Sequence, residues 1–228
     1  MNPKHLLKLG AGISAIAALS LLGAACEDEE GSGNLTSITV ANMEDRDLTD
    51  VSVYDDFEVT ITVDPSRPEA AQLIIDDNLV DDLFVSTDDG KLAVGFDELT
   101  GEKNPSRRPV LKLSVHSLEK VRANDWANIT VTGIHAARFE VEQAGHGHIE
   151  LSGRAGELEV RASEPGTVDA RALSADTVHL DQTDEGDIQV SATVSVTGTL
   201  DDEGDVLVYG SPPMQEIDVD GEGEVLMQ

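Results

Sequence analysis

The sequence predicts an all-β protein whose main part is a right-handed, single-stranded parallel β-helix (β-solenoid), with coils of about 18–21 residues. Three observations support this fold class. Apolar and polar residues alternate in short runs, which is the pattern of strands with one buried face. From residue 121 onward, such runs recur as six imperfect repeats. No long stretch carries the three-four apolar spacing of an amphipathic helix.

The composition excludes several classes of protein. The 228 residues include 15 Lys and Arg against 45 Asp and Glu, which gives a formal net charge of −30. Such a chain repels phosphate, so we expect no nucleic-acid partner. One cysteine can form neither an internal disulfide nor a multi-cysteine zinc site. The 39% of hydrophobic residues argues against disorder.

The first residues predict an export signal. Lys4 and Lys8 precede an uncharged apolar run over residues 9–25, and Cys26 follows it directly. Residues 22–26 (LGAAC) resemble the lipobox of bacterial lipoproteins, in which the signal is removed and the cysteine is acylated. Leu22 lies four residues before the cysteine, one more than in the usual pattern. The alternatives are an ordinary signal peptide and a short membrane span.

The predicted organisation therefore has three parts. Residues 1–25 form the signal peptide, residues 26–36 form an acidic and Gly/Ser-rich tether with Cys26 as the lipidation site, and residues 37–228 form the β-helix domain. Removal of the signal leaves 13 basic residues against 45 acidic ones, a formal charge of −32.

Six strands and one helical turn are predicted ahead of the repeats. Residues 77–83 could form the turn, with Val80 and Leu83 on its inner side. Asp, Gly, Ser and Pro separate the strands. The alternating apolar residues of the six strands are Ile38 and Val40; Val51 and Val53; Phe57, Val59, Ile61 and Val63; Leu73 and Ile75; Leu92 and Val94; and Leu111, Leu113 and Val115.

Each repeat then contains two alternating apolar pairs separated by a turn. The two pairs begin ten residues apart in the middle four repeats and eight apart in the outer two. Parallel pairing between successive coils, about 4.8 Å apart, would bury both pairs in a narrow core. A two-sheet antiparallel sandwich is the alternative. The first pairs are Val121/Ala123, Phe139/Val141, Leu158/Val160, Val178/Leu180, Val196/Gly198 and Ile217/Val219, and the second pairs are Ile129/Val131, Ile149/Leu151, Val168/Ala170, Ile188/Val190, Val206/Val208 and Val225/Met227.

The order and spacing of these segments carry a family resemblance. The segments are residues 51–63 (VSVYDDFEVTITV), 73–79, 89–94, 110–115, 118–121 and 203–212. Over residues 48–212 the chain resembles the head GIN domain family, also named putative auto-transporter adhesins, although acid or proline replaces the serine that is common in the family's turns. The resemblance implies a right-handed β-helix in a bacterial envelope lipoprotein, an adhesive or surface-associated role, and no established enzymatic activity.

Catalytic signatures are mostly absent. The chain has no Gly-x-Ser-x-Gly elbow, no Walker loop and no His-Glu-x-x-His motif. Residues 145–147 (GHG) resemble the Gly-His-Gly of pectin-degrading β-helix hydrolases, whose clefts are built from longer loops. His146 and His148 could share a metal ion, but two histidines alone make a weak site. We expect no catalytic residues, no cofactor-binding residues and no metal ligands.

Two features of the C-terminal half suggest further interactions. The last apparent strand, residues 225–228, has no polar cap, which favours self-association into a homo-oligomer. Stacked acidic turns repel each other unless they are solvated, or unless Ca²⁺, which binds six to eight oxygens, bridges them. Their acids are Asp184, Glu185, Asp187, Asp201, Asp202, Glu203, Asp205, Glu222 and Glu224.

The sequence thus predicts a non-catalytic β-helix module that is exported and lipid-anchored in the bacterial cell envelope. We expect an outer-membrane lipoprotein that faces the periplasm or the cell surface and serves in adhesion or in binding a surface polymer. Its expected partners are the membrane, through the anchor, and an envelope polysaccharide or protein. The alternatives are a polysaccharide-active enzyme and a periplasmic accessory of envelope-stress signalling.

Overall fold

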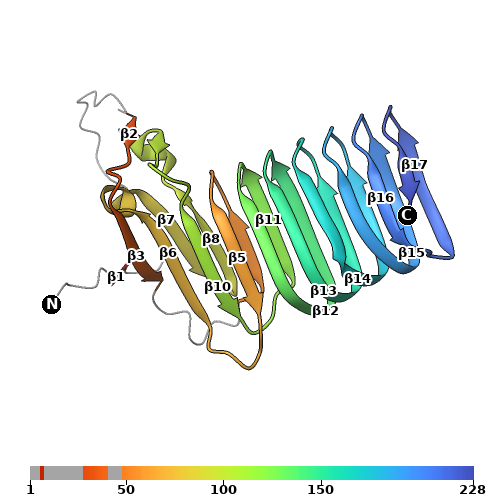
Figure 1. Ribbon diagram of the computed structural model, residues 1–228, viewed down its shortest axis with the longest axis horizontal. Helices are drawn as coiled ribbons and strands as arrows, with labels where there is room; N and C mark the ends of the chain where they lie inside the picture. Colours follow the sequence, from red (N-terminus) through yellow and green to blue (C-terminus); the bar gives the residue numbers. More distant parts are fainter. Residues whose placement is uncertain (1–5, 8–27, 41–47) are drawn as a thin grey trace.

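The fold is a parallel β-solenoid of about five turns (Figure 1). This computed structural model describes residues 6–7, 28–40 and 48–228. Strands account for 67% of the structure and helices for 4%. The predicted all-β class and the stacked parallel coils are confirmed.

Four long strands form the regular part of the solenoid. Each runs along one side, bends at the lower edge in Figure 1, and returns along the other side. The first side continues through β16 (Val206–Gly210) and β18 (Val225–Met227). On the second side, β11 (Lys120–Asp125) precedes the long strands and β17 (Met214–Asp220) follows them. All of these pair in parallel. The long strands are β12 (Asn128–Gly145), β13 (His148–Ala162), β14 (Thr167–Gln182) and β15 (Ile188–Asp201).

The registers confirm most of the predicted alignment between repeats. On the first side, Ile129 aligns with Ile149, and Val168 aligns with Ile188. On the second side the middle repeats also align as predicted, but the outer two differ. Val121 lies beside Val141 rather than Phe139, and Val196 lies beside Gln215 rather than Ile217. The coil therefore keeps its length while the apolar pair lies two residues later, which explains the eight-residue spacing in the outer repeats.

Antiparallel strands begin the solenoid at its N-terminal end. On the first side, β3 pairs antiparallel with β6 and β6 with β10, before the parallel pairs β10–β5 and β5–β12. On the second side, β7 pairs antiparallel with β8, and parallel pairing continues through β4 to β11. All six predicted strands are present, and β7 was not predicted. The bounds are β3 (Leu35–Val40), β4 (Asp50–Val53), β5 (Glu58–Val63), β6 (Ala70–Asp76), β7 (Leu83–Asp88), β8 (Lys91–Phe96) and β10 (Val110–Val115).

The predicted helical turn is the 3-10 helix η1 (Asp77–Asp82). Both residues predicted on its inner side face the core, since Val80 is partly buried and packs against it and Leu83, the first residue of β7, is buried. Leu79 is fully buried as well. A second 3-10 helix, η2 (Glu98–Thr100), lies between β8 and β10.

The described part of the expected tether is bonded to the domain. β2 (Glu29–Glu30) pairs with β9 (Lys103–Asn104), and Gly33 N donates to the buried carboxylate of Asp76 at 2.8 Å. Further upstream, β1 (Leu6–Leu7) pairs with β3. Cys26, and residues 1–5 and 8–25 of the expected signal peptide, lie outside the described residues. Within the described chain, no helix has the length and apolar character needed to cross a bilayer.

Candidate functional site

Most of the aromatic residues of the chain gather at one place. The sequence has only seven of them, four Phe, two Tyr and one Trp. Tyr54, Phe84, Phe96 and Trp126 line two adjoining hollows of about 540 and 320 Å³, which share Phe96 and three aspartates. We call these two hollows the aromatic cleft. Such concave sites with a few convergent polar groups are typical of ligand binding.

The cleft lies on the edge of the solenoid where short turns lead from the second side back to the first. We call this edge, uppermost in Figure 1, the turn edge. The turn at residues 54–57 joins β4 to β5, and the turn at residues 126–127 joins β11 to β12. The connection from β8 to β10, residues 97–109, forms the opposite wall. These three connections, together with Phe84 of β7, therefore build the site from separate parts of the sequence.

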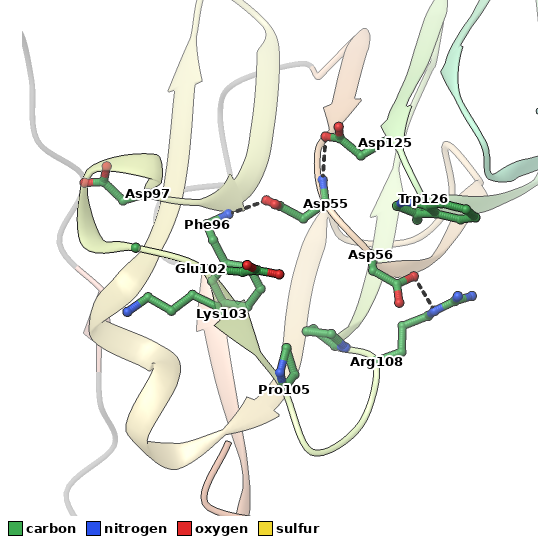
Figure 2. Close-up of a pocket in the computed structure, with 12 residues that line it drawn as sticks. Asp55, Asp56, Phe96, Asp97, Glu102, Lys103, Pro105, Arg108, Asp125 and Trp126 are labelled. Carbon is green, nitrogen blue, oxygen red and sulfur yellow. Dashed lines mark hydrogen bonds and ion pairs between the residues drawn. The ribbon is translucent and has the colours of Figure 1, made fainter. Parts of the chain in front are cut away.

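Two stacked aspartates hold these segments together (Figure 2). The register of β4 on β11 places Asp55 beside Asp125, and both have positive φ, 62° and 54°. Aspartate tolerates this left-handed conformation better than most residues do. Asp55 N donates to Asp125 Oδ2 at 3.1 Å, and Asp55 Oδ2 accepts from Phe96 N at 2.7 Å. The two carboxylates thus fix the turns that carry the rings.

The rings of the cleft are mostly open to solvent. Phe96 packs against the buried Phe57, with ring centroids 5.5 Å apart. Tyr54, Phe84 and Trp126 are exposed, Trp126 at 57%. The indole of Trp126 stacks on the imidazole of His146 from the next coil, with centroids 4.6 Å apart and an angle of 25° between the planes. Exposed apolar side chains gathered in one patch mark an interaction surface.

Acidic side chains dominate the charge around the larger hollow. Its five acids face two cations, Lys103 and Arg108, and both cations already have carboxylate partners. Lys103 Nζ lies 3.0 Å from Glu29 Oε2 and 3.1 Å from Asp82 Oδ1, and its side chain is 2% exposed. These hydrogen bonds, the one to Glu29 foremost, raise the pKa of Lys103. In Figure 2, Lys103 points away from Trp126.

Arg108 is held in the same way on the other side of the cleft. Its Nε lies 2.7 Å from Asp56 Oδ1, and its Nη1 lies 3.5 Å from Glu58 Oε2. Asp97 Oδ1 accepts from Leu99 N at 3.0 Å and so caps η2. The net charge of the lining is negative, because its acidic residues outnumber Lys103 and Arg108. The five acids are Asp55, Asp56, Asp97, Glu102 and Asp125.

The two histidines that could have shared a metal interact with different coils. His146 stacks on Trp126 of the preceding coil, whereas His148 Nδ1 lies 2.5 Å from Thr167 Oγ1 of the following coil. In the residues that the structure describes, no group of three or more His, Cys, Asp or Glu could hold a metal ion. The Gly-His-Gly turn therefore contributes a stacking ring to the edge of the cleft.

A family model described as "Putative auto-transporter adhesin, head GIN domain" matches residues 47–212. The chain belongs to the head GIN domain family. The resemblance seen in the sequence is confirmed over nearly the same residues. No curated protein matches the chain.

Solved structures share the fold of this head GIN domain. A putative adhesin from Bacteroides fragilis NCTC 9343 is similar with a TM-score of 0.71 at 16% identity, covering 88% of this chain and 100% of its own. A putative lipid binding protein from Parabacteroides distasonis ATCC 8503 has a TM-score of 0.57 at 18% identity, covering 89% and 100%. A putative adhesin from Parabacteroides merdae ATCC 43184 has a TM-score of 0.53 at 17% identity, covering 88% and 99%. At these identities the likeness shows the fold alone.

The acidic turns of the head GIN domain have a structural role that the sequence did not reveal. Asp187 Oδ1 accepts from Asp205 N at 3.0 Å, and Asp205 Oδ1 accepts from Glu224 N at 3.0 Å. At the equivalent position of an earlier coil, Asn128 Oδ1 accepts from His148 N at the same distance. Each side chain thus satisfies a backbone N–H of the next coil. In the described residues these turns bring no three acids together in an arrangement that could hold a Ca²⁺ ion.

The aromatic cleft itself was missed by sequence reasoning. Its rings come from residues 54, 84, 96 and 126, so no local motif contains them. One signal was available. Tyr54 and Trp126 lie among Asp and Asn residues directly after predicted strands, where a large ring has no core to enter. Because the chain has only seven aromatic residues, the position of two of them at turns indicates that these two rings are exposed on the surface.

Proposed function

We propose that this head GIN domain is a non-catalytic binding module of the bacterial cell envelope that attaches to a surface component through the aromatic cleft. The observation that carries this proposal is the gathering of four of the seven aromatic residues around two adjoining hollows, three of them exposed. The description of the family as adhesins supports an adhesive role. The aspartates of the cleft support binding rather than catalysis, because Asp55 and Asp125 both accept bonds from backbone N–H groups.

The proposal includes a lipid anchor on Cys26, as in an outer-membrane lipoprotein that faces the periplasm or the cell surface. Cys26 precedes Glu29 by three residues, and Glu29 binds Lys103 beside the cleft. Three extended residues span at most about 10 Å. An acyl chain on Cys26 would therefore keep the cleft end of the solenoid near the membrane, with the C-terminal coils directed away from it.

The anchor is tested in bacteria that express the full chain. We expect wild-type protein to incorporate labelled fatty acid and to fractionate with membranes, and Cys26→Ser to lose both properties. A variant upstream of the cysteine, Ser14→Ala, serves as the control. Equal membrane association of the wild type and Cys26→Ser would argue against lipidation.

The binding role is tested with the purified protein on immobilised envelope fractions. We expect Tyr54→Ala and Phe84→Ala to reduce retention about tenfold together, because their rings provide much of the exposed apolar surface of the cleft. Tyr209→Ala, which removes an aromatic residue outside the cleft, is the matched control. Equal retention of all variants would exclude the cleft as the binding site. Release of sugar from the fractions would favour the alternative, a polysaccharide-active enzyme.

Self-association remains part of the proposal. β17 and β18 have no partner on their outer edges among the described strands, and Val219, Leu226 and Met227 are exposed there. The acids of β17 oppose close approach of two copies, so we expect a dimer only at high salt. Light scattering at low and at high salt measures this, and a monomer in both conditions would remove the idea.

A further inference from the structure

We infer that the aromatic cleft binds a cationic segment of a partner protein and places a lysine or arginine side chain between its rings and its carboxylates. This inference rests on the proposed function and specifies the chemistry of the partner. It follows from the charge of the lining, the exposure of the rings, and an arrangement of the same kind inside the chain.

The charge of the lining favours a cation. Of seven charged residues around the larger hollow, five are acidic, and the two basic ones are neutralised by Glu29, Asp82, Asp56 and Glu58. Within the described part of the chain, neither Asp97 nor Asp125 forms a salt bridge. A cleft lined by one sign of charge concentrates ligands of the opposite sign. Acidic polymers are repelled for the same reason.

The carboxylates keep capacity for a ligand. Asp125 Oδ2 accepts one bond, from Asp55 N, and Asp97 Oδ1 accepts one, from Leu99 N. An ionised carboxylate offers about four lone-pair sites. Both groups therefore hold their turns in place and still present oxygen atoms to the hollow that they line. Ammonium and guanidinium groups are strong donors to such oxygens.

The rings supply the second half of the recognition. A cation over the face of an indole or phenol ring is attracted to it within about 6 Å, and Trp is the strongest partner. Trp126 is largely exposed even though His146 stacks on it. Tyr54 and Phe84 border the smaller hollow, which shares Asp97 and Asp125 with the larger one. A long basic side chain can thus contact rings with its methylenes and carboxylates with its tip.

The chain contains an internal example of this contact. Arg171 Nε lies 2.9 Å from Asp169 Oδ1 and 3.1 Å from Asp169 Oδ2, while the guanidinium carbon lies 6.0 Å from the centre of the Tyr209 ring. One arginine is thus bound by a carboxylate of its own strand, β14, and by an aromatic ring on β16, two coils further along. The cleft presents the same two kinds of group, a carboxylate and an aromatic ring. In the described chain, no basic side chain forms a salt bridge with Asp97 or Asp125.

The turn edge beyond the cleft favours a protein segment over a small amine or a lipid. Acidic residues continue along this edge into the last coils, so a chain with several basic residues can follow it. A neutral sugar would leave the acids without compensation, and a phospholipid headgroup would bring its phosphate against them. The acids on this edge include Glu164, Asp184, Glu185, Asp202, Glu203 and Glu222.

The only tryptophan of the chain allows a direct test, because Trp126 lies in the cleft. Fluorescence of the full chain is titrated with acetyl-tetra-arginine amide, with acetyl-tetra-glutamine amide as the neutral control. We expect a saturable change in Trp126 emission with the arginine peptide, weakened at least fivefold by 0.5 M NaCl, and no change with the glutamine peptide.

Two matched variants separate the cleft from the general acidity of the chain. Asp125 and Asp202 both lie at the turn edge with positive φ, 54° and 88°, and asparagine tolerates this conformation. We expect Asp125→Asn to weaken binding of the arginine peptide about tenfold by calorimetry, and Asp202→Asn to weaken it less than twofold. Each variant removes one negative charge, and the amide oxygen introduced by Asp125→Asn can still accept from Asp55 N, so the turn is kept and the comparison reports the position of the charge.

Several outcomes would overturn the inference. Equal weakening by the two variants would mean diffuse attraction to an acidic surface. A change in Trp126 emission caused by N-acetylchitotriose, chitotriose or phosphatidylethanolamine vesicles, with none from the arginine peptide, would assign the cleft to a glycan or a lipid and leave the proposed function intact. If none of these probes changes the emission of Trp126, and the cleft variants still bind envelope fractions as the wild type does, both the inference and the proposed function fail.

Discussion

The two ends of the solenoid have the same parallel core but are covered differently. At the N-terminal end, antiparallel strands and η1 cover the core, and Ile38 and Leu79 are buried. At the C-terminal end, the inward-facing positions of the last described coil are exposed, Val219 at 47% and Met227 at 42%. The aromatic cleft lies only at the first of these ends.

This difference shows why the binding site lies where the repeat is irregular. In the regular coils, equivalent turns stack closely, as when Asp187 accepts from the backbone of Asp205. Such an edge is ridged and leaves little room for a hollow. The 97–109 connection departs from the repeat and stands opposite the turns at Asp55 and Asp125. One irregular segment thus provides a wall for the cleft at the N-terminal end of the solenoid. We call this end, where antiparallel strands and η1 cover the core, the closed end.

The largest expected effect is loss of a large core side chain in the middle of the solenoid, compared with one in the last described coil. Phe139 is fully buried in β12, so Phe139→Ala should destabilise the domain by about 3–5 kcal/mol. Met227→Ala, in the last described strand, should cost about 0.5 kcal/mol or less. Urea unfolding measures both free energies. Similar losses would mean that the last coil is as well packed as the middle of the solenoid.

The second effect compares two glycines of the turn edge. A Cβ on Gly147 would lie 1.8 Å from the carbonyl oxygen of Ala127, and one on Gly223 would lie 2.2 Å from that of Gly204. Gly147 has coils on both sides and cannot move away, so Gly147→Ala should cost about 3 kcal/mol. Gly223 is in the last described coil, which can shift outward, and Gly223→Ala should cost about 1 kcal/mol. Thermal unfolding tests the ratio, and equal costs would contradict an adaptable C-terminal end.

The regular end of the molecule was the more predictable one. Ladders such as Ile129, Ile149 and Val168 could be read from the sequence, because stacking in register demands the same residue type at the same interval. The antiparallel strands around β6 and β7 follow no repeat, so their pairing partners could not be derived from spacing. The cleft depends on that pairing. Asp55, Phe96 and Asp125 meet only because β4 lies between β8 and β11.

The third effect is specific to the closed end and depends on pH. Asp76 is buried and accepts from Gly33 N at 2.8 Å, Ser106 N at 2.9 Å and Ser106 Oγ at 2.7 Å. Burial alone would raise its pKa, but these hydrogen bonds outweigh burial and hold the pKa of Asp76 below its usual value. A lowered pKa stabilises the fold above the unfolded pKa of about 4, and this contribution disappears as the pH falls through the folded pKa.

We therefore expect Asp76→Asn to destabilise the domain by about 1–3 kcal/mol at pH 7, because an amide NH₂ cannot accept from these donors. The difference from the wild type should shrink as the pH falls below about 4. Unfolding free energies between pH 7 and pH 3 measure this. Asp205→Asn, which affects a single N–H acceptor in a late coil, is the control. A difference that stayed constant down to pH 3 would contradict the assigned role of the carboxylate.

The smallest effect concerns the outer surface of the second side, where early and late coils also differ. Arg161 donates to Glu140 at 2.7 Å and to Glu159, whose side chain is 7% exposed. At the same register position in the next two coils, Thr199 Oγ1 donates to Asp181 at 3.0 Å, and this hydrogen bond is exposed. Exposed ion pairs contribute little, but a nearly buried carboxylate that loses a partner costs more. Arg138 also contacts Glu159 and limits that loss.

Arg161→Ala should therefore cost about 1 kcal/mol, and Thr199→Ala should cost less than about 0.5 kcal/mol. Salt separates the two cases, because 0.5 M NaCl screens charges and leaves a neutral hydroxyl bond nearly unchanged. The cost of Arg161→Ala should shrink in salt, measured by urea unfolding, while that of Thr199→Ala should stay the same. If salt leaves both costs unchanged, packing of the arginine stem rather than charge stabilises the early coils.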